Sequence, residues 1–121
     1  MLFKYLAVGG VAFEMYNKYS ESISLPDSLS IRNISEIYQS MTLALRDSRA
    51  LVVEVPATAE ADLSFVQLME AARVDAKAAG KTLRLSSPAS GSVLKVLQRG
   101  GFIDAFTAED AQFWLHQEVY P

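Results

Sequence analysis

The sequence predicts a small α/β sandwich with one mostly parallel β-sheet, in the order β-α-β-α-β-α-(β)-α. Short apolar runs end at proline or glycine, as strands do. Between these runs, apolar residues recur at intervals of three and four, which is typical of amphipathic helices. A chain of 121 residues, half of them hydrophobic, has enough apolar surface for one domain with its own core.

The first half of the pattern is a strand, a helix and a second strand. Residues 22–25 alternate polar and apolar side chains and stop at Pro26, which predicts a short strand. Residues 30–47 predict a helix with one apolar face, formed by Ile34, Ile37, Tyr38, Met41 and Leu45. Residues 50–55 are Val-rich and end at Pro56. They predict a central strand that is covered on both faces.

A second helix is predicted from Asp62 to about Ala79. Aspartate suits the N-cap position, and Gly80 suits the C-terminal end. The inner face is predicted to consist of Phe65, Val66, Met69, Ala72 and Ala76. Glu70 and Asp75 fall off this stripe, so we expect both to face solvent.

The third strand is predicted at residues 82–85, followed by a serine-rich loop over 86–90. A short helix then begins at Ser90 or Ser92 and ends at Gly100. Its inward residues are predicted to be Val93, Val96 and Leu97.

The C-terminal part predicts one more short strand segment and a last helix. Phe102 and Ile103 form the strand segment. Thr107 begins the helix, with Asp110 three residues later as its capping-box partner. Because strands and helices alternate throughout, neighbouring strands are expected to be parallel and their crossovers right-handed.

Residues 1–20 are predicted to be either a first hairpin or an N-terminal extension of a domain that covers 21–121. Apolar residues alternate on both sides of Gly9 and Gly10, a pair that permits a two-residue hairpin turn. The apolar stretch is too short for a membrane span and has no signal-peptide cleavage pattern. We therefore expect a cytoplasmic protein without direct membrane insertion.

The composition excludes several classes of function. There is no cysteine, and 11 basic and 14 acidic residues leave a net charge of −3 without a basic stripe, so no nucleic-acid partner is expected. His116 is the one histidine, and neither glycine pair has the spacing of a phosphate-binding loop. We therefore expect no catalytic residue, no metal site, no cofactor and no enzymatic activity.

The most informative position is the junction at Asp62, where a helix is predicted to begin at the carboxyl edge of the sheet. Free N–H groups and the helix dipole favour negative charge there. A nearby hydroxyl, Ser64 or Thr58, can carry a regulatory phosphate. The alternative is that Ser64 only helps to cap the helix, which is a common use of serine at helix starts.

Three segments together resemble the STAS domain, which is shared by anti-sigma-factor antagonists and the cytoplasmic tails of sulfate transporters. Residues 24–29 are similar to the family's first strand, tight turn and helix start. Residues 51–55 and 61–69 resemble its central strand and the Asp-Ser-Ser-Gly-Leu start of its next helix. Residues 84–97, followed by Gly101 and Phe102, resemble its third strand, proline-containing loop and third helix.

The resemblance implies a non-enzymatic protein-interaction domain that docks a partner through the start of its second helix. The implied contact residues are Asp62, Leu63, Ser64 and Phe65, together with Ser86, Ser87 and Pro88 in the loop after the third strand. Family members that work as phosphorylation switches carry the modified Ser or Thr directly after the aspartate. Here Leu63 takes that position, Ser64 keeps a hydroxyl one residue later, and Phe65 replaces the family's glycine.

The resemblance also implies the class of partner. A regulatory adaptor of this family, acting in bacterial signal transduction, binds a histidine-kinase-like ATPase or anti-sigma factor. Alternatively, the chain is a cytosolic subunit of an ABC-type lipid transport complex and contacts the transporter's ATPase subunit. A third possibility is a small-ligand-binding domain, because the sheet edges of α/β folds often bind ligands.

Overall fold

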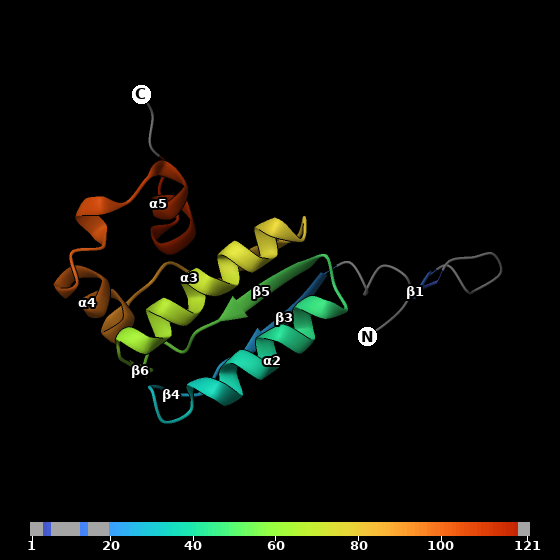
Figure 1. The fold of residues 1–121 in the computed structure, drawn as a ribbon, viewed down its shortest axis with the longest axis horizontal. Helices are drawn as coiled ribbons and strands as arrows, with labels where there is room; N and C mark the ends of the chain where they lie inside the picture. The colour runs from blue at the N-terminus through green and yellow to red at the C-terminus, as the bar shows by residue number, and fades with distance from the viewer. Residues whose placement is uncertain (1–3, 6–12, 15–19, 119–121) are drawn as a thin grey trace.

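A three-stranded parallel sheet forms the centre of the computed structural model, which describes residues 4–5, 13–14 and 20–118 (Figure 1). Its strands are β3 (Ser20–Ser24), β5 (Ala50–Glu54) and β7 (Thr82–Leu85), in that order. Helix α2 (Ile34–Arg46) connects β3 to β5, and α3 (Leu63–Ala78) connects β5 to β7. The predicted α/β fold with parallel neighbours is confirmed.

The central strand β5 is buried mainly on one face, although the sequence predicted burial on both. Leu51 and Val53 are fully buried, whereas Val52 between them is half-buried and Glu54 is exposed. The strand order follows the chain order, so right-handed crossovers place α2 and α3 on the same face of the sheet. The opposite face of β5 is therefore the more open one.

The core is built around α3, whose predicted inner face is confirmed. Ile37 and Met41 of α2 are buried against this helix, and so are Val93 and Leu97 of α4 (Gly91–Arg99). The buried residues of α3 are Phe65, Val66, Leu68, Met69, Ala72 and Ala76. Because helices lie on two sides of α3, its position along the sheet is closely fixed.

A second, smaller parallel ladder was not predicted from the sequence. It pairs β4 (Ser28–Leu29) with β6 (Glu60–Ala61), just before α2 and α3 begin. Leu29 is completely buried, and its carbonyl oxygen accepts a hydrogen bond of 3.2 Å from the N–H of Asp62. The ladder therefore holds the loop after β3 beside the start of α3.

The segment at Phe102 and Ile103 is not the strand that the sequence predicted. Residues Ile103–Ala105 form a 3₁₀ turn, η1, and both predicted strand residues are half-buried against the core. The N–H of Ala105 bonds to the carbonyl of Phe102 at 3.0 Å. Such local bonds use backbone groups that a strand would pair with its neighbour. In the described chain, β7 is consequently the last strand of the sheet.

The last helix, α5 (Ala108–Leu115), begins with the predicted capping box. The hydroxyl of Thr107 accepts a hydrogen bond from the N–H of Asp110 at 3.1 Å. The carboxylate of Asp110 accepts one from the N–H of Thr107 at 3.0 Å. The N–H of Thr107, followed by the Thr107 hydroxyl and the Arg73 guanidinium, holds the pKa of Asp110 below its usual range, although burial opposes the effect.

Glu70 joins α3 to α5, a role that the sequence did not predict, although its side chain keeps 42% of its surface exposed to solvent. Its carboxylate accepts hydrogen bonds of 2.8 Å from both the indole N–H of Trp114 and the guanidinium of Arg73. Arg73 also pairs with Asp110 at 3.1 Å and lies 4.5 Å from the ring centre of Phe113. A periodicity argument places Glu70 off the apolar stripe, but α5 covers that side of the helix.

Two short strands precede the domain. β1 (Lys4–Tyr5) and β2 (Phe13–Glu14) pair antiparallel, with Tyr5 opposite Phe13. The proposed turn at Gly9 and Gly10 lies outside the described residues.

Replacing Glu70 by alanine is expected to lower the free energy of unfolding by about 1–3 kcal/mol, because the buried indole N–H of Trp114 loses its acceptor. Urea denaturation followed by the fluorescence of the single tryptophan measures this change. Asp75→Ala is the matched control, since Asp75 is exposed on the same helix and its loss is expected to change stability by less than about 0.5 kcal/mol. Equal effects of the two substitutions would contradict the role of Glu70.

Candidate functional site

The carboxylate of Asp62 caps α3, as the sequence predicted, and also binds a loop that is distant in sequence. One oxygen, Oδ1, accepts hydrogen bonds from the backbone N–H of Ser64 at 3.0 Å and from the Ser64 hydroxyl. The other, Oδ2, accepts a bond of 3.0 Å from the N–H of Ile31. Asp62 therefore links the start of α3 to the loop that follows β4.

The hydrogen bonds also set the charge of this site. The Ser64 hydroxyl, followed by the backbone N–H groups of Ile31, Ser64 and Phe65, holds the pKa of Asp62 below its ordinary value, although partial burial opposes the effect. The helix dipole further favours a negative charge at this end of α3. Asp62 is therefore an anion at neutral pH, fixed in position by its donors.

Two exposed aliphatic residues are neighbours of this carboxylate, one along the chain and one through a backbone hydrogen bond. Leu63 is 47% exposed and Ile31 is 67% exposed, and both rank among the large exposed hydrophobic residues of the described chain. Leu63 follows Asp62 in the sequence, whereas Ile31 is brought beside it by the β4–β6 ladder. The sequence analysis missed Ile31 because no local pattern reveals a ladder between segments about thirty residues apart.

Phe65 cannot belong to the surface to which the sequence analysis assigned it. Its side chain is fully buried in the core, so a docked partner does not reach it. Ser64 is half-buried, and its hydroxyl is engaged with Asp62. Of the predicted contact residues around the helix start, the structure thus leaves Leu63 as the exposed apolar one.

Ser86, Ser87 and Pro88 are exposed, but they lie in a loop that is held by other neighbours. The N–H of Ala89 donates a hydrogen bond of 2.7 Å to the carbonyl of Trp114 in α5. Within the described chain, no hydrogen bond joins residues 86–88 to residues 62–64. Hydrogen bonds and chain adjacency therefore join Ile31, Asp62, Leu63 and Ser64, and none of the described hydrogen bonds ties the serine-proline loop to them.

The start of α4 is hydrogen-bonded to β6, the short strand directly before Asp62. The hydroxyl of Ser92 accepts a hydrogen bond of 2.8 Å from the N–H of Ala61, directly before Asp62. Gly91 has a φ angle of 54°, and a Cβ atom there would lie 2.9 Å from the carbonyl oxygen of Ala57. A glycine is needed at this close approach, which places Ser92 against β6.

The single histidine lies on another element. His116 is exposed, with a positive φ of 55° at the C-cap of α5. In the part of the chain that the structure describes, no group of three or more histidine, aspartate or glutamate residues is arranged to hold a metal ion. Across those same residues, no helix has both the length and the apolar character needed to cross a membrane.

Comparisons with known proteins add no relative. No protein-family model, curated protein or solved structure matches this chain. The resemblance to STAS domains therefore rests on the chain's own sequence segments.

Removing the cap with Asp62→Ala is expected to destabilise the protein by about 0.5–2 kcal/mol, because two backbone N–H groups lose their acceptor. Urea denaturation at pH 7 measures this loss. Ser35→Ala serves as a control, since Ser35 is an exposed residue of α2. An unchanged denaturation midpoint for Asp62→Ala would show that the carboxylate does not stabilise this junction.

The stabilisation by Asp62 is also expected to depend on pH. Because its pKa is lower in the folded protein, the contribution is fully present above the ordinary aspartate pKa of 3.8 and is lost as pH falls through the lowered folded value. The stability difference between the wild type and Asp62→Ala should therefore be constant near neutral pH and shrink below pH 3.8. Denaturation midpoints between pH 7 and about pH 3 test this, and a difference that grows on acidification would contradict it.

Proposed function

We propose that this chain is a STAS-like, non-enzymatic protein-interaction domain that docks a partner through the start of α3. The observation that carries the proposal is a carboxylate fixed by three donors, with the exposed aliphatic residues Ile31 and Leu63 next to it through a backbone hydrogen bond and through the sequence. We call the surface formed by Ile31, Asp62, Leu63 and Ser64 the α3-start surface.

The α3-start surface has the features of a small interface centre. Burying what is now exposed of Ile31 and Leu63 would contribute about 2–3 kcal/mol of hydrophobic free energy. Both residues are attached to backbone that is already held by the β4–β6 ladder and the α3 cap. Docking would therefore require little ordering of the chain, and ordering is one of the main costs of binding.

Asp62 adds specificity to this apolar contact. A carboxylate offers about four lone-pair positions. Three of them are used by the N–H of Ile31 and by the N–H and hydroxyl of Ser64. The remaining position favours a partner that presents one hydrogen-bond donor together with apolar side chains.

Ser64 is the point at which phosphorylation would control the same surface. Its hydroxyl now donates to Asp62, so a phosphate on Ser64 would replace an attraction with repulsion between two anions. The helix N-terminus tolerates the added charge, which limits the damage to the fold. Phosphorylation of Ser64 would therefore weaken docking without unfolding the domain.

The partner can be identified by placing a photo-cross-linking amino acid at position 63, in cells that naturally make the chain. Position 43 is the matched control. Leu43 lies near the C-terminal end of α2, and its exposed fraction of 53% is close to the 47% of Leu63. We expect a protein adduct at position 63 that is absent at position 43. A histidine-kinase-like ATPase or anti-sigma factor supports the regulatory adaptor, and a transporter ATPase supports the transport subunit.

The purified partner then allows a binding titration. Leu63→Asp and Ile31→Asp are each expected to weaken binding at least about tenfold, which corresponds to 1.4 kcal/mol, because a charge replaces an apolar contact. Leu43→Asp and Ser64→Ala are expected to bind nearly as the wild type does. Circular dichroism confirms that each variant is folded. Wild-type affinity in both folded Asp variants would show that the α3-start surface is not the interface.

A further inference from the structure

The outer edge of β7 carries backbone groups that no described strand pairs. The N–H of Thr82 bonds to the carbonyl of Arg49, and the N–H of Ser86 bonds to that of Val53, each at 2.9 Å. Backbone groups of successive strand residues point to opposite edges. Residues 82, 84 and 86 therefore face β5, and the N–H and C=O groups of Leu83 and Leu85 point outward from the sheet.

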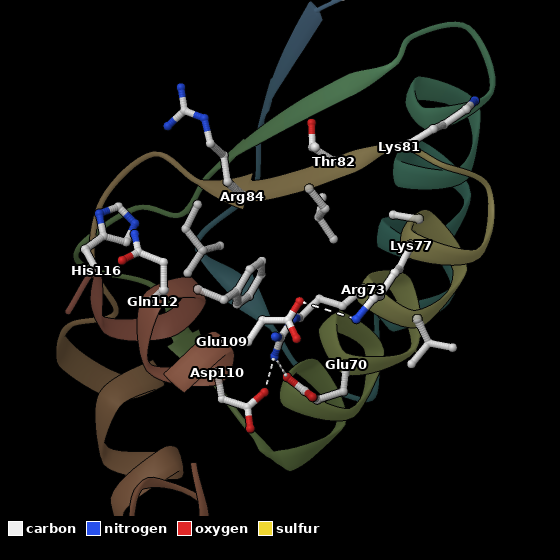
Figure 2. Close-up of a pocket in the computed structure, with 15 residues that line it drawn as sticks. Glu70, Arg73, Lys77, Lys81, Thr82, Arg84, Glu109, Asp110, Gln112 and His116 are labelled. Carbon is white, nitrogen blue, oxygen red and sulfur yellow. Dashed lines mark hydrogen bonds and ion pairs between the residues drawn. The ribbon is translucent and has the colours of Figure 1, made fainter. Parts of the chain in front are cut away.

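This edge opens into a groove between β7, α3 and α5, with a volume of about 730 Å³ (Figure 2). Apolar side chains line it from all three elements, namely Leu83 and Leu85 of β7, Ala76 of α3 and Phe113 of α5. Val74 of α3 also lines the groove and is 68% exposed. An added strand would thus meet both the backbone groups that no described residue pairs and an apolar floor.

The charges around the groove are mostly neutralised by one another. Arg73 is paired with Glu70 and Asp110, and Lys77 lies 3.6 Å from Glu109. Arg84 is different, because it is exposed and has no ion pair in the described part of the chain. Its side chain projects from β7 on the side away from α3 and α5, as that of Thr82 does (Figure 2).

We propose that the edge of β7 binds an extended segment of another protein as an additional strand, and that this segment places an acidic residue between two apolar ones. Residues opposite each other in a sheet project to the same face. The residues opposite Leu83 and Leu85 would face the apolar groove, and the residue between them would lie beside Arg84. The expected pattern is apolar, acidic, apolar in either strand direction.

Arg84 gives this edge its selectivity. A charged residue on an edge strand discourages pairing with unrelated strands. The charge would lose part of its hydration, or would be repelled by a like charge on the incoming strand. A carboxylate on the incoming strand turns this obstacle into an attractive cross-strand pair. The edge is therefore suited to acidic extended segments and unsuited to neutral or basic ones. The inference stands apart from the α3-start surface, with which the groove shares no residue.

Two capped peptides of opposite charge test the proposal with the full chain. The probe is the heptapeptide Ser-Thr-Val-Glu-Val-Thr-Ser, and its control carries Lys in place of Glu. We expect the acidic peptide to slow hydrogen exchange of the Leu83 and Leu85 amides, measured by NMR, and to leave the outward-facing amide of Ser22 on the opposite edge unchanged. The Lys peptide is expected to bind at least tenfold more weakly.

Charge reversal and edge blocking provide the variants. Arg84→Glu is expected to reverse the peptide preference, whereas Arg99→Glu, at an exposed arginine of α4, is expected to keep it. Leu83→Pro removes one outward N–H of β7 and is expected to weaken binding of the acidic peptide at least tenfold. Ser22→Pro removes one outward N–H from the opposite edge of the sheet and is expected to leave this affinity unchanged. Where a proline variant does not fold, the charge reversal and the exchange measurement decide.

Three results would overturn the proposal. The first is unchanged exchange at Leu83 and Leu85 at millimolar peptide, and the second is equal affinity for the Glu and Lys peptides. The third is a dimer in sedimentation analysis, with these two amides protected without any peptide. That last result would assign the edge of β7 to a second copy of this chain.

Discussion

The burial of α3 between the sheet and its neighbouring helices is the constraint on which the rest of the structure depends. Phe65, Val66 and Met69 are completely buried, and Ala72 and Ala76 continue the same face along the helix. Close-packed interiors resist small shifts of their side chains. Because this face fixes the helix, Asp62 is set at the edge of the β4–β6 ladder, and the C-terminal half of α3 forms one wall of the groove along β7.

Polar contacts attach the neighbouring segments to α3 at two places. Asp62 holds the loop after β4, and Glu70 with Arg73 holds α5 through Trp114 and Asp110. Among the described residues, every buried side-chain nitrogen or oxygen has a hydrogen-bond partner. Removing one partner of such a contact leaves a desolvated group behind, so these contacts specify the arrangement of the segments as well as stabilising it.

The sequence predicted those features that depend on neighbours along the chain. The strand at 82–85 has a local signature in its residue pattern, and the Asp62 cap and the Thr107 capping box are contacts within a few residues; all three are confirmed. Features that depend on distant segments were missed or misassigned. Glu70 lies 44 residues from Trp114 and Ile31 lies 31 residues from Asp62, so helical periodicity carries no information about either contact. Phe65 illustrates the limit at the candidate site, because position alone placed it both at the helix start and on the inner face, and packing decided for the core.

The two proposed surfaces lie on opposite parts of one rigid helix, which determines how they can influence each other. Eight residues separate Asp62 from Glu70, where the groove begins along α3, or about 12 Å along a helix. That distance exceeds the Debye length of about 8 Å at physiological salt, so charges at the two surfaces interact weakly through solvent. Mechanical coupling would need α3 to shift, and its buried face resists such a shift. The two surfaces would therefore bind independently, and with both occupied the domain would hold two partners together without a conformational change of its own. In the proposed adaptor, phosphorylation of Ser64 would act on one contact and leave the other intact.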